Sequence, residues 1–143
     1  MKIKQLYLVA FLITVFAIPT QAQSYTEVVW KQIQNSYEEN AEMGYVVKNY
    51  IIGMIQESDD NTWSFYLDSS KEYLFEGFCD EDCEDLDLYL YNDEGTELDK
   101  DVEEDDFPLF FFEPERSGHY KVNVTMYSCS VEPCYFGLAI FEK

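Results

Sequence analysis

The chain has 143 residues, with 29 acidic and 9 basic side chains and a formal net charge of −20 at pH 7. That length allows one ordinary domain and excludes a multidomain enzyme. The negative charge repels phosphate backbones and anionic lipids, so no nucleic-acid partner is expected, and 47% hydrophobic residues exclude a disordered acidic tail.

The first 22 residues have the order of a secretory signal peptide. Lys2 and Lys4 form a basic start, residues 5–18 are almost wholly apolar, and residues 20–22 follow Pro19 with small side chains at the cleavage positions. The apolar run is shorter than the roughly 20 residues that cross a bilayer. We therefore expect cleavage after Ala22, export to the periplasm or outside the cell, and no membrane span in the mature chain. An uncleaved anchor is the alternative.

Residues 23–43 are predicted to form an amphipathic helix, because they contain no proline or glycine. Val29, Ile33 and Tyr37 recur at every fourth position, and Trp30 joins this stripe. Gly44 is a plausible helix stop. We expect the stripe to pack on the protein's own sheet, and a partner-binding surface is the alternative.

After Gly44 the pattern changes to short runs of β-branched and aromatic residues, in which apolar and polar side chains alternate. Turn residues separate these runs, and Gly95 closes a hairpin turn that needs a positive φ. Residues 44–143 are therefore predicted to form an antiparallel, jelly-roll-like β-sandwich, which makes the whole chain mostly β with one N-terminal helix. The predicted strands lie near residues 45–55, 63–67, 73–78, 86–91, 96–98, 109–112, 120–126 and 135–141.

The four cysteines are Cys79, Cys83, Cys129 and Cys134. An even number in an exported chain indicates two disulfides, and the close spacing favours the local pairs 79–83 and 129–134. A zinc site with four cysteine ligands is the alternative, although its usual spacing of two intervening residues is absent.

The acidic side chains are concentrated between residues 79 and 106, where 15 carboxylates accompany one lysine, Lys100. If each strand reverses direction, the loops at residues 79–85, 100–108 and 127–134 share one end of the sandwich. Calcium binds carboxylate and carbonyl oxygens from such loops, and a cation would relieve the repulsion. The alternative is a solvated acidic loop without metal. The candidate ligands are Asp80, Asp82, Asp85, Asp87, Asp101, Asp105 and Asp106.

Tyr66, Tyr89 and Tyr91 have the opposite parity from the core residues of their strands. They are a candidate surface for a sugar or protein partner, unless the helix or the other sheet covers them. His119 lies at a predicted turn, and no nucleophile motif accompanies it, so no catalytic residues are expected.

Residues 73–141 contain the runs 73–77 (YLFEG) and 85–91 (DLDLYLY), the turn glycine Gly95, and the run 117–124 (SGHYKVNV). With these residues the stretch resembles the bacterial pre-peptidase C-terminal domain, in a small cysteine-containing secreted subgroup. The resemblance covers about half of the chain. It implies a secreted jelly-roll-like sandwich and, in some members, binding of calcium or of a substrate surface. It implies no catalytic activity.

These observations favour an exported, non-catalytic binding or accessory module that calcium can stabilise. The expected partner is a protein or polysaccharide in the envelope or outside the cell. An acidic inhibitor-like protein that blocks a basic secreted enzyme is the main alternative, and a small hydrolase is a third.

Overall fold

The computed structural model describes residues 21–143. The predicted signal peptide lies outside the described residues, apart from Gln21 and Ala22 at the start of the helix. The chain forms one helix followed by eight strands, and each predicted strand overlaps one of them. The elements are α1 (Gln21–Glu42), β1 (Val46–Ile55), β2 (Asp60–Leu67), β3 (Tyr73–Cys79), β4 (Cys83–Asn92), β5 (Glu97–Asp101), β6 (Leu109–Phe112), β7 (Gly118–Cys129) and β8 (Cys134–Glu142).

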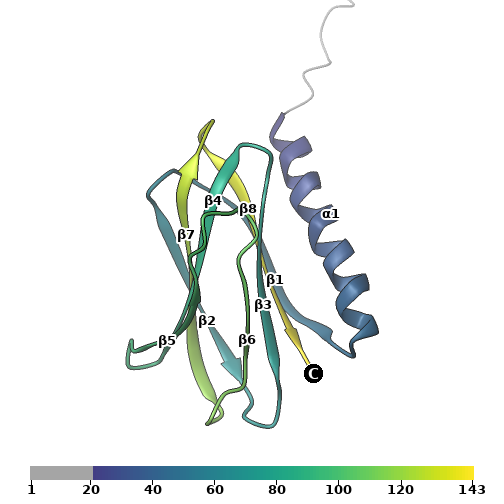
Figure 1. Ribbon diagram of the computed structural model, residues 1–143, viewed down its shortest axis with the longest axis vertical. Helices are drawn as coiled ribbons and strands as arrows, with labels where there is room; N and C mark the ends of the chain where they lie inside the picture. Colours follow the sequence, from purple (N-terminus) through teal and green to yellow (C-terminus); the bar gives the residue numbers. More distant parts are fainter. Residues whose placement is uncertain (1–20) are drawn as a thin grey trace, which may run out of the picture.

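The strands form two four-stranded antiparallel sheets that pack face to face (Figure 1). The first sheet has the order β1-β8-β3-β6 and the second has the order β2-β7-β4-β5. This exchange of strands between two sheets is the arrangement of an eight-stranded jelly roll. The predicted fold class is therefore confirmed. Helix α1 covers the outer face of the first sheet and does not cover that of the second.

The main core lies between the sheets. Leu86, Leu88 and Leu90 of β4 and Val122 and Val124 of β7 are all 0% exposed. Successive side chains of a strand point to opposite faces, so the alternating pattern places all five on the inner face. This core makes the two sheets a rigid support for the residues on their outer faces.

A second, smaller core lies between α1 and the first sheet. Val29 and Ile33 are buried there against Phe78 and Phe141. They approach the backbone of Gly137 so closely that an added Cβ would lie 2.7 Å from Val29 Cγ1 and 3.0 Å from Ile33 Cδ1. Glycine is therefore required at residue 137 for the helix to seat at this depth.

The predicted helical stripe is only half correct. The inner face continues through the buried Ser36 and Asn40, while Trp30 is 37% exposed and Tyr37 is 46% exposed. The physical reason lies in β3, where Glu76 faces the helix and accepts hydrogen bonds from both polar side chains. A buried carboxylate needs such donors, so the polar pair takes the inner face and the aromatic residues lie on its flank.

Two glycines have the positive φ that their turns require. Gly44 has φ +90° and ends the helix, where its backbone N–H donates to the Ala41 carbonyl over 3.1 Å. Gly95 has φ +86° in the hairpin between β4 and β5. Both positions match their predicted roles.

The cysteines form the two predicted local disulfides, Cys79–Cys83 and Cys129–Cys134. They connect β3 to β4 and β7 to β8, and Cys83 pairs with Cys129 in the second sheet. Both bridges therefore strengthen the same end of the sandwich.

Candidate functional site

The three acidic and cysteine-bearing loops meet at one end of the sandwich, as predicted. The backbone N–H of Leu86 donates to the Asp105 carbonyl over 2.9 Å, which joins the start of β4 to the loop between β5 and β6. Ser130 N–H donates to the Asp82 carbonyl over 2.7 Å, which joins the β7–β8 turn to the β3–β4 turn. We call this region the acidic end.

Several predicted calcium ligands accept hydrogen bonds from backbone N–H groups. Asp80 is 2% exposed and accepts the Tyr135 backbone N–H over 2.8 Å. Asp101 accepts the N–H of Leu109 over 2.9 Å, and Asp105 accepts the N–H of Phe107 over 3.0 Å. These carboxylates satisfy backbone donors at the starts of β8 and β6 and in the loop between β5 and β6, which is a structural role.

The seven candidates do not form a ready-made metal site. Asp106 is exposed, and Asp82 is half-buried beside Tyr25. Across the described part of the chain, residues 21–143, no three His, Cys, Asp or Glu side chains are grouped to hold a metal ion.

Asp85 differs from the other carboxylates at this end. It is 9% exposed, and among the described residues its buried Oδ1 has no hydrogen-bond partner. Burial raises the pKa of Asp85, and the nearby Asp87, Glu104 and Asp105 raise it further. The pKa of Asp87 is raised mainly by burial, although its Oδ2 accepts the Tyr89 hydroxyl over 3.1 Å. Asp85 is therefore the one position here where a cation would supply a missing partner.

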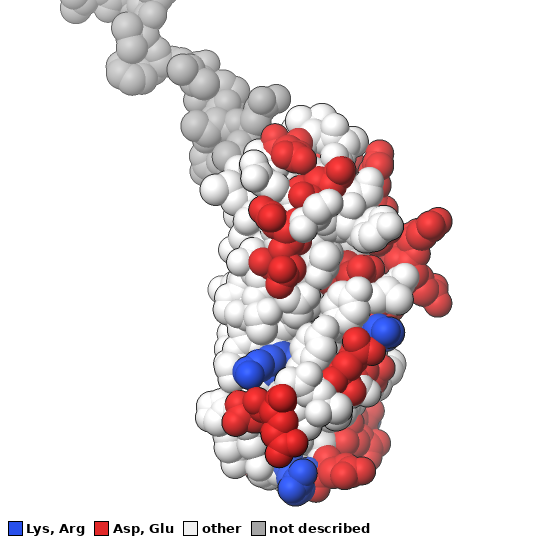
Figure 2. All heavy atoms as spheres, turned by 90° about the vertical axis from the view of Figure 1, so that its left-hand side faces the viewer, with Lys and Arg blue, Asp and Glu red and all other residues white. Residues whose placement is uncertain are grey.

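The three candidate tyrosines lie on the outer face of the second sheet, which the helix does not cover. Tyr66 is 53% exposed and its ring meets His119 edge-on, at 5.7 Å between centroids. Tyr89 and Tyr91 stack on each other at 6.3 Å. Figure 2 shows this side of the molecule, with acidic side chains spread over it and few basic ones between them.

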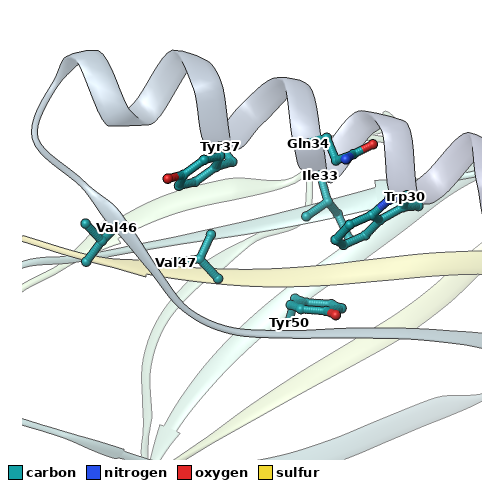
Figure 3. Close-up of a pocket in the computed structure, with 7 residues that line it drawn as sticks. All are labelled: Trp30, Ile33, Gln34, Tyr37, Val46, Val47 and Tyr50. Atoms are coloured by element: carbon teal, nitrogen blue, oxygen red, sulfur yellow. The ribbon is translucent and has the colours of Figure 1, made fainter.

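A second aromatic surface lies beside the helical stripe, which the sequence predicts to pack on the sheet, with a partner-binding surface as the alternative. A groove of about 460 Å³ runs between α1 and the edge strand β1 (Figure 3). Trp30 and Tyr37 project from the helix on one side, and Val46 and Tyr50 from β1 on the other. We call it the α1–β1 groove.

The aromatic residues of the α1–β1 groove are held by regular elements. The centroids of the Trp30 and Tyr50 rings lie 5.2 Å apart, at an interplanar angle of 45°. Tyr50 is 49% exposed, so both rings keep free surface. The groove continues along the helix into a second hollow of about 550 Å³, which shares Trp30 and Tyr50 and adds Glu27 and Ile52. The sequence signal for this surface is Trp30, one residue outside the buried helical stripe.

Among residues 21–143, no helix has the length and apolar character needed to cross a bilayer. The chain matches no model of a known protein family and no curated protein.

Proposed function

We propose that this protein is an exported, non-catalytic binding module, and that its α1–β1 groove recognises an uncharged polysaccharide. The observation that carries this proposal is the exposed aromatic pair Trp30 and Tyr50 on a rigid helix and strand. Aromatic faces bury large apolar area at low entropic cost, and the tyrosine hydroxyl and indole N–H can bond a hydroxylated ligand. Export is supported by the two disulfides, which suit an oxidising compartment.

The shape and charge of the surface support a neutral chain ligand. The two hollows share Trp30 and Tyr50, so they offer an elongated trough rather than a closed pocket. The net charge of −20 disfavours anionic polysaccharides. The resemblance of residues 73–141 to the pre-peptidase C-terminal domain supports an accessory role of this kind.

The test is native gel electrophoresis through gels that contain a soluble glucan, mannan or galactan. We expect at least one of these uncharged polysaccharides to retard the wild-type protein. Trp30→Ala and Tyr50→Ala should remove the retardation, since stacking on one ring is worth about 1 kcal/mol or more. Tyr66→Ala is the matched control, because Tyr66 is about as exposed as Tyr50 but lies on the other sheet. If Tyr66→Ala lost the retardation and Trp30→Ala kept it, the binding site would lie on the outer face of the second sheet. If none of the three polysaccharides retarded the wild-type protein, the proposal would be refuted.

We further propose that calcium stabilises the acidic end through Asp85, and that the loops close on the ion with carboxylates whose charges already act on Asp85, namely Asp87, Glu104 and Asp105. The unpartnered Oδ1 of Asp85 supports this assignment. Calcium should raise the melting temperature relative to chelator, and magnesium should raise it less because magnesium retains its waters. Equal melting temperatures in calcium and chelator would leave only a solvated acidic end.

The acidic end also supports the inhibitor-like alternative. The connecting residues 80–82, 102–108 and 130–133 contain no lysine or arginine. A basic secreted enzyme would bind there with strong dependence on salt. If the protein captured a basic enzyme, the double variant Glu103→Gln/Glu104→Gln should bind that enzyme more weakly and Trp30→Ala should bind it normally. That result would favour the inhibitor-like function over polysaccharide binding.

A further inference from the structure

The other flank of α1 borders a second groove, between the helix, β3 and β6. It has a volume of about 510 Å³ and is separate from the α1–β1 groove. Its apolar lining is incompletely covered, since Met43 and Phe111 are each 52% exposed and Phe107 is 42% exposed. We call it the α1–β3 groove. The lining residues that matter below are Gln32, Ser36 and Asn40 from the helix and Glu76, Phe107 and Phe111 from the sheet side.

A buried carboxylate lies among these apolar side chains. Glu76 is 6% exposed, and its Oε2 accepts the hydroxyl of Ser36. Its Oε1 accepts Asn40 Nδ2 over 3.1 Å, and Asn40 Nδ2 also lies 2.9 Å from Ser36 Oγ. A carboxylate offers about four acceptor positions, so these bonds leave acceptor capacity unused.

The polar part of the groove offers hydrogen-bond acceptors, and within residues 21–143 no basic side chain lines it as a counter-ion. Gln32 also lines it, and the Gln32 Oε1 is buried without a hydrogen-bond partner among the described residues. Glu39 adds a second carboxylate, whereas none of the lining residues is basic. A buried carboxylate is normally accompanied by a cation, because its desolvation is costly. Burial and the charge of Glu39 accordingly raise the pKa of Glu76.

We propose that the α1–β3 groove binds an organic ammonium ion with an apolar body, and that Glu76 is its counter-ion. The ammonium N–H groups would donate to the free acceptor positions of Glu76 and to Gln32. The apolar body would pack against Phe107 and Phe111 at the rim, where aromatic faces also attract a cation. Neutral and anionic ligands lack the charge that Glu76 requires, so the groove discriminates by charge.

The groove is preformed in the way that small-ligand sites are. Phe78 and Phe107 hold each other edge-on, with centroids 5.2 Å apart. Glu76 is held on a central strand by two donors from the helix, which fixes its position before a ligand arrives. Concave apolar sites with a few convergent polar groups are the usual form of a small-molecule site.

The test uses three probes that share one apolar body and differ in charge: benzylammonium, benzyl alcohol and benzoate. Each is titrated into the folded protein while amide chemical shifts are followed by NMR. We expect saturable shifts for benzylammonium at Leu74, Glu76 and Phe111, and weaker or no shifts for the other two. The proposal would be overturned if benzyl alcohol gave chemical-shift changes of the same size and midpoint as benzylammonium. It would also be overturned if the benzylammonium shifts occurred only at residues outside the α1–β3 groove.

Two variants separate binding from folding. Glu76→Gln keeps the shape and one acceptor oxygen, and it should weaken benzylammonium binding about tenfold or more, as loss of a charge-assisted bond does. Phe111→Ala, at an exposed rim position, should weaken binding without lowering the melting temperature, whereas Tyr127→Ala at a distant exposed position should change neither. Unchanged affinity in Phe111→Ala and in a folded Glu76→Gln would show that Glu76 only anchors the helix. If Glu76→Gln does not fold, the comparison of Phe111→Ala with Tyr127→Ala decides alone. Because the shifts map to a groove that excludes Trp30 and Tyr50, failure here leaves the polysaccharide proposal standing.

Discussion

Substitution of Gly137 by alanine tests how the helix is seated on the sheet, on which both grooves depend. The added Cβ would lie 2.7 Å from Val29 Cγ1, well inside ordinary van der Waals contact. Val29 is 0% exposed and Ile33 is 2% exposed, so neither side chain can turn away and the helix itself must shift. Overpacking of this kind costs about 1–3 kcal/mol. For a domain of this size that corresponds to a melting temperature lower by roughly 4 °C per kcal/mol.

The matched control is Gly118→Ala, since no atom lies within 4 Å of a Cβ added at Gly118. Urea unfolding and thermal melts of both variants give the two free energies, and amide hydrogen exchange locates the change. We expect Gly137→Ala alone to be destabilised, with faster exchange along α1. Equal stability of the two variants, with unchanged protection of α1, would refute the seating of the helix at Gly137.

Further predictions concern the buried carboxylates and the disulfides. Without calcium, Asp85→Asn should raise the free energy of unfolding at pH 7 by about 1–3 kcal/mol, because it removes a buried charge that lacks a partner. Asp106→Asn, at an exposed position, should change the free energy of unfolding little. A loss of stability of Asp85→Asn in urea melts would contradict this prediction. Burial is the main cause of the raised pKa of Glu76, Asp80, Asp85 and Asp87. The folded state therefore binds protons at these four carboxyl groups more tightly than the unfolded state does. Protonation of these groups stabilises the fold fully below the ordinary carboxyl pKa, and this stabilisation is lost as the pH rises through the folded-state pKa. Unfolding free energies from urea melts should consequently fall as the pH rises above the ordinary carboxyl pKa of about 4. The fall should be smaller in Asp85→Asn, and a rise with pH would contradict the reasoning. Reduction of the disulfides should cost on the order of 1–3 kcal/mol each, since both close short loops, and a melting temperature unchanged by reductant would contradict it.

The sandwich could be predicted because apolar and polar residues alternate along several strands, most clearly along β4 and β7. Leu86, Leu88 and Leu90 repeat every second residue between turn residues, and only the inner face of a sheet accommodates that pattern. Strand reversal then predicts which loops meet, and the two short cysteine spacings predict local bridges. These features depend on the pattern of residues that are close together along the chain, so they can be predicted from a single sequence.

The exact face of the helix could not be predicted in the same way. Its rotation is set by Glu76, which lies 36 residues from Asn40 along the chain and selects polar partners for the inner face. The role of Asp80 has the same origin, since its partner Tyr135 lies on β8 and the hydrogen bond forms only when β3 and β8 pair. Periodicity places a side chain on a face, but it does not identify the group on the opposing element.

The most direct test of the proposed function is an NMR titration of the wild-type protein with oligosaccharides cut from an uncharged polysaccharide that retards it. The side-chain indole N–H of Trp30 is the reporter, because its ring lies against Tyr50 in the α1–β1 groove. We predict saturable shifts at the Trp30 indole and at the amides of Tyr37 and Tyr50, with Tyr66 and the acidic end unchanged. Shifts centred on Tyr66, Tyr89 and Tyr91 or on the acidic end, with the Trp30 indole unmoved, would contradict the proposal.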